Sequence, residues 1–462
     1  GCSKLTNIKL RNNLVKIEKN AFMKCASIDE IVFPSSIKSI GEGSFADCTL
    51  LNKVTFYSQI EKLKSRIFSN CRNLKEVILP SDLQEICDEV FLNCLKLKKI
   101  EIPNKVESIG YRSFYGCKSL EEMKFPSSMK SIGSYSFYQC FCLKYVRLPY
   151  SLKVIENDLF HDCLNLEDIK IYENVEKIKS NAFEGCKSLK TVIIPKSVES
   201  IGYRAFSKCS QLTKVSLNPN ITFIGEDCFS GCIKLNEIKI PNLLRKILNG
   251  TFQFCSSLVK IDFPSIKSIG NHAFSGCSNL KEIRFSNHLE SIGKYAFSDC
   301  SSLNNITIPS LVKKISVGAF SNCISIWKVV IPLRLEIIDD FAFNNCEKLL
   351  NLTCSTSSSF AGFDSLTCKV KFPDSLISIG NFAFYGCSSI KELVLNSNLD
   401  IIGNSAFCNC VEIERIQMSS SLRIIGDKAF NNCNNINEMT NLLNIQSIGH
   451  FAFEKCESLK EI

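Results

Sequence analysis

The stretch from Cys186 to Cys209, CKSLKTVIIPKSVESIGYRAFSKC, decides the fold because the rest of the chain repeats it. Val192 and Ile194 alternate with outward-facing positions, which is the period-2 pattern of a short strand. Pro195 is expected to end this strand because proline lacks the N–H that a strand ladder requires. Ala205–Phe206 is expected to form a single helical turn. A unit of 23 residues cannot bury these faces alone, so it must stack on its neighbours as one coil of a solenoid.

The cysteines of this unit recur along the whole chain. Twenty of the 26 cysteines fall in phase, and we call them the ladder cysteines. The spacing is 23 residues except for one residue lost before Cys277 and one longer interval before Cys387. The ladder cysteines are Cys2, Cys25, Cys48, Cys71, Cys94, Cys117, Cys140, Cys163, Cys186, Cys209, Cys232, Cys255, Cys277, Cys300, Cys323, Cys346, Cys387, Cys410, Cys433 and Cys456.

Two further positions follow the same period. A phenylalanine stands three residues before each of the last nineteen ladder cysteines, from Phe22 to Phe453, which indicates a packing column and not a catalytic site. Asn, Gly or Asp stands directly before fourteen of these cysteines, so we expect a positive φ there. The glycine of the Ile-Gly pair is replaced in eight copies, once by Leu248, which argues against a required positive φ at that position.

The sequence predicts one elongated repeat array over residues 1–462. Residues 1–353 and 369–462 are regular, and residues 354–368 form an irregular, serine-rich insertion. Cys354 and Cys368 flank the insertion and could be joined by a disulfide; the alternative is two buried thiols. Because the first and last residues fall inside repeats, we expect the sequence to be part of a longer protein.

Composition limits the function classes. Hydrophobic residues make up 45% and charged residues 22%, which is typical of folded globular proteins and excludes general disorder. The net charge of +9 is small beside 101 charged residues, so it does not indicate a nucleic-acid partner. The sequence contains no run of eighteen consecutive apolar residues, so it does not predict a segment that inserts into a membrane.

The repeated pattern C-x2-L-x2-I-x-Φ-P-x2-Φ-x2-I-G-x2-A-F-x2-C, with Φ apolar, resembles the 23-residue leucine-rich repeats of the BspA-like type. These repeats, also called the Treponema pallidum type, are known from surface proteins of bacteria and parasitic protists. The resemblance implies an α/β solenoid, a right-handed superhelix of about 20 coils. A parallel β-sheet would lie on its concave face, with short helical turns and extended segments on its convex face. It also implies an adhesin-like role.

The cysteines and histidines do not predict chemistry. Neighbouring ladder cysteines would lie about 4.8 Å apart with parallel Cβ directions, so they are expected to be buried thiols and not disulfides. Cys140–Cys142 and Cys408–Cys410 are C-x-C pairs, but neither has the second pair that a structural zinc site requires. No nucleophile, phosphate-loop or metalloprotease motif is present. We therefore predict no enzyme, no cofactor and no metal.

A basic patch is the first candidate binding site. The outward positions five and seven residues after each ladder cysteine should form parallel rows on the sheet. Lys124, Arg147 and Lys170 follow one another in the second of these rows, with Tyr145 beside them. They could bind an acidic protein or a sulfated glycan. The alternative is a solvated face that is neutralised by nearby acids: Glu121, Glu122, Glu167 and Asp168.

Aromatic residues supply two more candidates. Trp327, the only tryptophan, lies four residues after Cys323 and is expected to share its strand with outward Val330, and exposed aromatics are frequent anchors of binding. The alternative is that its ring covers the strand edge. Phe360 and Phe363 lie in the insertion, where an irregular loop in a regular array can carry a specific contact.

Two functions follow from these features. The first is a non-enzymatic module at the cell surface or outside the cell, which binds a protein or glycan partner, such as a host surface or extracellular matrix, through its concave sheet. The second is an intracellular scaffold in the cytoplasm that uses the solenoid for protein–protein assembly. Four Asn-x-Thr sequons, at Asn220, Asn249, Asn305 and Asn351, do not distinguish the compartments.

Overall fold

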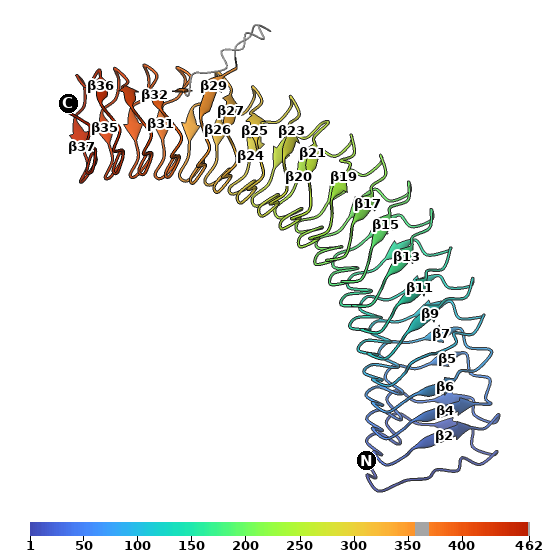
Figure 1. Ribbon diagram of the computed structural model, residues 1–462. Coiled ribbons are helices and arrows are strands. Elements are labelled where there is room, and N and C mark those ends of the chain that lie inside the picture. Colours follow the sequence, from blue (N-terminus) through green and yellow to red (C-terminus); the bar gives the residue numbers. More distant parts are fainter. Residues whose placement is uncertain (356–368, 461–462) are drawn as a thin grey trace. The chain divides into compact units, whose positions relative to one another are not determined.

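The computed structural model describes residues 1–355 and 369–460 and divides the chain into two units, Gly1–Ile233 and Lys234–Ile462. The described residues form 37 strands, which pair in parallel, and no helix. The predicted solenoid of stacked coils is therefore confirmed, whereas the predicted α/β character and short helical turns are wrong. In each unit the strands follow one another in chain order along the stack (Figure 1).

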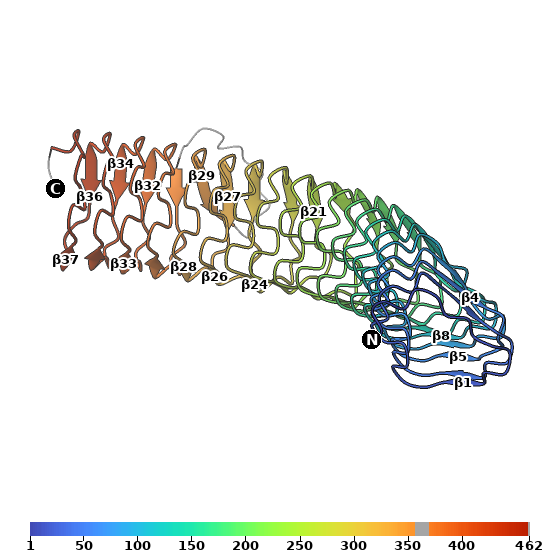
Figure 2. The same ribbon diagram turned by 90° about the horizontal axis from the view of Figure 1, so that it is seen from below.

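Most coils contain two strands, and equivalent strands of neighbouring coils pair with each other, so that the strands form two rows. First-row strands begin about five residues after a ladder cysteine, and second-row strands contain the recurring two-residue segment that ends in isoleucine or leucine. In the second unit, Figure 2 shows β32, β34 and β36 along one edge of the coils and β33 and β37 along the opposite edge.

The first-row strands of the first unit are β2 (Glu30–Phe33), β4 (Lys53–Phe56), β6 (Glu76–Ile78), β9 (Glu122–Lys124), β11 (Tyr145–Arg147), β13 (Asp168–Lys170), β15 (Thr191–Ile193) and β17 (Lys214–Ser216). Its second-row strands are β1 (Lys16–Ile17), β3 (Ser39–Ile40), β5 (Lys62–Leu63), β7 (Glu85–Ile86), β8 (Ser108–Ile109), β10 (Ser131–Ile132), β12 (Val154–Ile155), β14 (Lys177–Ile178), β16 (Ser200–Ile201) and β18 (Phe223–Ile224).

The first-row strands of the second unit are β19 (Glu237–Ile238), β21 (Lys260–Asp262), β23 (Glu282–Arg284), β25 (Asn305–Thr307), β27 (Lys328–Ile331), β29 (Asn351–Cys354), β30 (Lys369–Lys371), β32 (Glu392–Val394), β34 (Arg415–Gln417) and β36 (Glu438–Thr440). Its second-row strands are β20 (Lys246–Ile247), β22 (Ser268–Ile269), β24 (Ser291–Ile292), β26 (Lys314–Ile315), β28 (Ile337–Ile338), β31 (Ser378–Ile379), β33 (Ile401–Ile402), β35 (Ile424–Ile425) and β37 (Ser447–Ile448).

The recurring phenylalanines form a buried column inside each unit. Phe183 lies between Phe160 and Phe206, with ring centroids 5.5 and 5.2 Å away, and all three side chains are fully buried. Offset stacking at such distances adds to the gain from burying each ring. The column is the apolar core that no single coil could provide for itself.

The ladder cysteines lie beside this column and are hydrogen-bonded. The Cys186 thiol donates to the Phe160 carbonyl of the preceding coil at 3.2 Å, and Cys323 repeats this contact with Phe297. The described cysteines are all free, and most ladder cysteines are buried. Burial raises the pKa of the Cys232 and Cys277 thiols to about 12 each.

The segment that was expected to be a helical turn has a different hydrogen-bond pattern. Alternate N–H groups of Arg204, Phe206 and Lys208 donate to carbonyls of the next coil at 2.9, 2.9 and 2.7 Å. Arg204 and Lys208 have φ values of 52° and 60°. Because these donors are used between coils, they cannot form the i to i−4 bonds of a helix.

The two predictions about positive φ are confirmed. The residue before each of the nineteen ladder cysteines has a positive φ, including non-glycine residues such as Gln139 at 58°. Gly202, from the Ile-Gly pair, does not, but a Cβ on it would lie 2.5 Å from the backbone of Lys179. Glycine at this position therefore permits a close approach of neighbouring coils.

The insertion adds one strand to the first row only. β29 and β30 pair through Leu352 and Val370, whereas in the second row β28 pairs directly with β31. Phe343 likewise stacks on Phe384 at 5.4 Å, so the phenylalanine column is uninterrupted. Between Cys346 and Cys387, the described residues therefore contribute two first-row strands, β29 and β30, but only one second-row strand, β31. The single array over residues 1–462, the right-handed winding and the concave position of the sheet remain predictions.

Candidate binding surface

The first-row strands present two outward rows of side chains, as the period-2 pattern predicts. In β15, Thr191 and Ile193 are exposed while Val192 is buried. Parallel register places equivalent residues side by side, as with Thr191 beside Lys214 and Ile193 beside Ser216. We call this the first-row face. Its outward residues differ from coil to coil, because only the inward ones must fit the core.

The predicted basic patch lies on this face over β9, β11 and β13. Arg147 is in register with Lys124 on one side and Lys170 on the other, and Tyr145 is in register with Glu122 and Asp168. These residues line a groove of about 670 Å³. Tyr145 is 54% exposed. We call this the basic groove.

Its three cations have different surroundings. Lys124 forms an ion pair with Glu122 at 3.3 Å. The Lys170 ammonium lies 4.9 Å from the centroid of the Tyr172 ring, a cation–π contact. Among residues 1–355 and 369–460, no carboxylate forms an ion pair with Arg147. Within the described residues, Arg147 is therefore the one of these three cations that has neither an ion pair nor a cation–π contact.

The surrounding acids are only partly neutralised. Glu122 also contacts Lys99 at 3.7 Å, and Glu167 contacts Lys144 at 3.1 Å. The hydrogen bond from Lys144 lowers the pKa of Glu167. Asp168 has no ion pair within the described part of the chain. Glu121 pairs with Lys98 at 3.9 Å, so of the four acids only Glu122 contacts a cation of the patch. Within the described residues, Arg147, Lys170 and Asp168 have no ion pair.

The tryptophan candidate is partly exposed. Trp327 is 45% exposed, directly before β27, and Val330 within β27 is half-buried. Val330 lies between Thr307 and Thr353 in the register of the neighbouring strands. Lys328, the other outward residue of β27, lies between Trp327 and Val330 in the sequence and is in register with Asn305 and Asn351.

The candidates in the insertion cannot be placed. Phe360, Phe363 and Cys368 lie outside the described residues, so the proposed disulfide between Cys354 and Cys368 is untested. Cys354 is a half-buried free thiol whose sulfur lies 3.8 Å from the Lys371 carbonyl oxygen. Burial raises its pKa.

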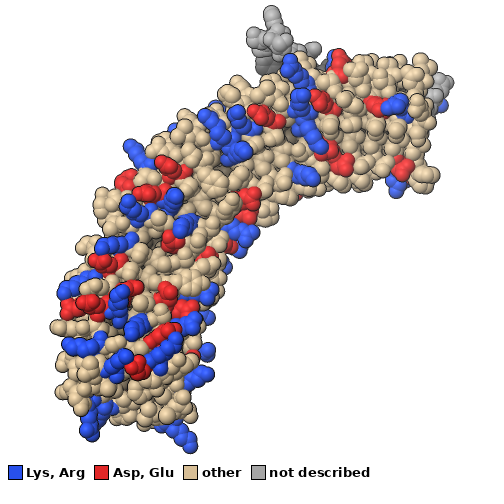
Figure 3. Space-filling view, turned by 180° about the vertical axis from the view of Figure 1, so that it is seen from behind, with Lys and Arg blue, Asp and Glu red and all other residues tan. Residues whose placement is uncertain are grey.

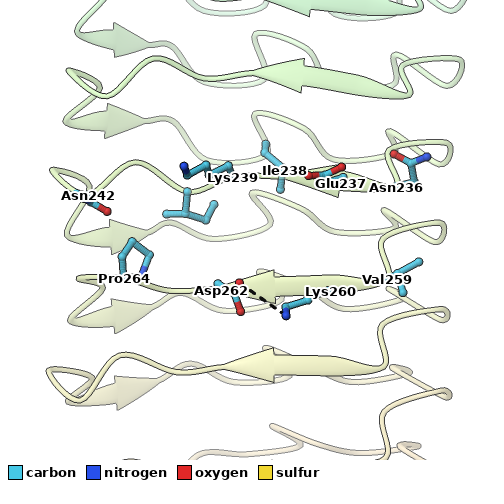
Figure 4. Close-up of a pocket in the computed structure, with 10 residues that line it drawn as sticks. Asn236, Glu237, Ile238, Lys239, Asn242, Val259, Lys260, Asp262 and Pro264 are labelled. Atoms are coloured by element: carbon cyan, nitrogen blue, oxygen red, sulfur yellow. Dashed lines mark ion pairs between the residues drawn. The ribbon is translucent and has the colours of Figure 1, made fainter.

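A second groove, of about 530 Å³, was not predicted. It lies where the coil after Cys255 is one residue shorter than its neighbours (Figure 4). The Arg245 guanidinium donates to the carbonyls of Asn242 and Ser265 at 3.3 and 3.4 Å and so links the shortened coil to the preceding one. The groove is lined by Asn236, Glu237, Ile238, Lys239, Ile240, Asn242, Val259, Lys260, Asp262 and Pro264. The shortened Pro264-Ser265-Ile266 segment was the signal in the sequence.

Two further kinds of feature concern metal ions and membranes. No group of three or more His, Cys, Asp or Glu side chains there could hold a metal ion. In the same residues, no helix is long and apolar enough to cross a membrane. Figure 3 shows basic and acidic groups interspersed within each unit on the face it draws.

Comparison with known proteins agrees with the repeat pattern. The family model described as BspA type leucine-rich repeat region (6 copies) matches residues 1–98, 84–213, 176–288, 267–367 and 356–462. No curated protein matches the sequence.

Solved structures include several similar chains. A leucine-rich repeat protein from Bacteroides ovatus is 29% identical, with a TM-score of 0.59 and 82% of each chain covered. The leucine-rich repeat protein of T. pallidum is 30% identical, covers 38% of this chain and 72% of its own, and has a TM-score of 0.29. A leucine-rich cell surface protein from Faecalibacterium prausnitzii is 23% identical, with 78% and 87% covered and a TM-score of 0.40. Since the family model spans the chain from end to end, the chain belongs to the BspA-type leucine-rich repeat family.

Proposed function

We propose that this chain is a non-enzymatic binding module of the cell surface, which recognises a protein or glycan through its first-row face. The observation that carries the proposal is the separation of roles within each coil. Phenylalanines and thiols fill the interior, while large side chains such as Tyr145 and Ile193 in the first-row strands, and Trp327 directly before β27, are exposed. Exposed aromatic residues on such a face are typical anchors of binding.

Two clusters are the proposed contact points. The first is the basic groove, with Lys124, Arg147, Lys170 and Tyr145. The second is Trp327 with Val330, and we include Phe360 and Phe363 of the insertion as further candidates, because the insertion follows β29 directly. Leucine-rich repeat proteins generally bind protein partners, which favours this use of the fold.

The location at the cell surface, and adhesion to a host or matrix ligand, rest on the resemblance to surface proteins of this repeat type. Partner identity is left open between proteins and glycans. We propose no nucleic-acid partner, because acids line the basic groove and no continuous basic stripe extends from it.

An intracellular scaffold is the second candidate. The observation that favours it is the large number of free, buried thiols, which suit a reducing compartment. Such a scaffold would use the same first-row face for assembly with other proteins.

The test compares two charge-reversal variants in binding to intact cells and to immobilised extracellular-matrix proteins. The first variant carries Lys124→Glu, Arg147→Glu and Lys170→Glu on the first-row face. The control carries Lys38→Glu, Lys177→Glu and Lys246→Glu, which reverse the same number of exposed basic residues on or beside the second row. We expect the first variant to bind at least tenfold more weakly and the control to bind like the wild type. Equal binding by all three proteins would contradict the proposal.

A further inference from the structure

In the described residues that line the basic groove, Arg147 is the cation with neither an ion pair nor a ring contact, whereas Lys124 contacts Glu122 and Lys170 contacts Tyr172. Arg147 lies at the centre of three adjacent strands, about 4.8 Å from Lys124 and Lys170 at the backbone. Two flanking cations raise the local potential without competing for the same anion, because Lys124 contacts Glu122 and Lys170 contacts Tyr172. A guanidinium presents a planar fork that matches a carboxylate with two hydrogen bonds.

We propose that the basic groove binds an acidic side chain of a polypeptide partner, with Arg147 as its anchor and Tyr145 as the adjoining apolar contact. This inference rests on the proposed binding function of the first-row face. It narrows that function to one class of partner and one residue.

The arrangement of acids favours a polypeptide over a sulfated polysaccharide. Glu122 and Asp168 stand in register on either side of Tyr145, in the outward row next to Arg147. A regularly sulfated chain that reached Arg147 would extend past the groove and bring sulfates near these carboxylates, which would repel them. A polypeptide can place one acidic residue at Arg147 and a backbone N–H or a basic residue at Asp168.

Tyr145 supplies the apolar part of the contact. The Lys144 ammonium lies 5.2 Å from the centroid of its ring, and Lys144 also forms an ion pair with Glu167 at 3.1 Å. A tyrosine side chain offers a large contact area with few rotatable bonds, so it loses little freedom on binding. We therefore expect an aliphatic or aromatic residue close to the acidic residue in the partner.

The experiment is a selection from a phage-displayed random peptide library on three immobilised proteins: wild type, Arg147→Glu, and Lys187→Glu as control. Lys187 is exposed and lies directly after Cys186, outside the groove, so its reversal changes the charge equally. We expect peptides with Asp or Glu next to an apolar residue to be enriched on the wild type and the control and not on Arg147→Glu. No such enrichment, or equal enrichment on Arg147→Glu, would overturn the inference.

Direct binding measurements separate the two partner classes. For a selected peptide, Arg147→Ala should lower the affinity at least tenfold and Tyr145→Ala at least threefold, with unchanged circular dichroism. Heparin oligosaccharides should bind wild type and Arg147→Glu with equal affinity. A tenfold loss of heparin affinity in Arg147→Glu but not in Lys187→Glu would instead assign the groove to a sulfated glycan. Because the peptide selection uses neither cells nor matrix, its failure is distinguishable from failure of the proposed surface function.

Discussion

At the scale of single residues, the ladder cysteine combines small size with a hydrogen-bond donor. The sequence predicted a buried, unreactive thiol, and burial is confirmed for most ladder positions. It did not predict that the thiol would donate to the phenylalanine carbonyl of the preceding coil, as Cys232 does to Phe206 at 3.2 Å. Alanine would lack that donor, and larger apolar residues would not fit beside the stacked rings.

Buried thiols predict a loss of stability at high pH. The pKa of Cys232 is raised to about 12, whereas in the unfolded chain it lies near its ordinary value of 9.0. The unfolded state therefore releases protons first, and the unfolding free energy falls as pH rises above about 9. At pH 10.5 one such thiol contributes a loss of about 2 kcal/mol relative to pH 8.

Urea denaturation at pH 8 and pH 10.5 measures this effect. Cys232→Ala should lose less stability between the two pH values than the wild type does. An identical pH dependence of the two proteins would refute the account of Cys232.

The residue before each ladder cysteine predicts a second effect. Gln139 has a φ of 58°, a region that β-branched residues enter with difficulty. We expect Gln139→Val to lower the unfolding free energy by about 1–2 kcal/mol and Gln139→Asn to leave it unchanged or raise it. Thermal denaturation of both variants checks this, and equal stability of the two would show that φ does not constrain the position.

At the scale of elements, the sequence predicted the strands and not the turns. Alternation around Val192 identified β15 because one face of the strand is buried. The Ala205–Phe206 pair favours a helical turn in the sequence, but the structure directs the N–H of Phe206, like those of Arg204 and Lys208, to the next coil. The positive φ at Arg204 could not be predicted from residue type, since Arg, Tyr, His and Phe all occupy the equivalent position in other coils.

The phenylalanine column predicts a large cost for a single truncation. Phe183→Ala would leave a void between Phe160 and Phe206, so we expect a loss of about 3–5 kcal/mol in unfolding free energy. Ile193→Ala is the control, because this side chain is 71% exposed. Urea denaturation should separate the two variants clearly, and a loss below about 1 kcal/mol for Phe183→Ala would contradict a continuous column.

At the scale of the whole molecule, the 23-residue period made both the coil stacking and the basic groove predictable. Equivalent positions must lie side by side in register, which placed Arg147 between Lys124 and Lys170. The pairing of individual charges could not be predicted, because it depends on side-chain conformations such as that of Lys170 over Tyr172. The groove near Pro264 could not be predicted, because the one-residue shortening between Cys255 and Cys277 appears in the sequence only as a change in spacing.

Repetition also predicts which deletions the chain tolerates. Removing residues 187–209 deletes one full coil and keeps every later residue in phase, so the β-rich circular dichroism spectrum and cooperative unfolding should persist. Removing residues 187–198 breaks the phase and should leave unpaired strands and an insoluble protein. Similar behaviour of the two deletions would argue against stacked equivalent coils.

The central claim, that each coil keeps its ladder thiol inside and its variable residues outside, can be tested on one peptide. Cys140 is fully buried, and Cys142, two residues later, is exposed. Native protein is treated with iodoacetamide and digested, and alkylation of each cysteine is followed by mass spectrometry. We predict rapid modification of Cys142 and protection of Cys140 until the protein is unfolded; equal rates at the two cysteines in native protein would contradict the account.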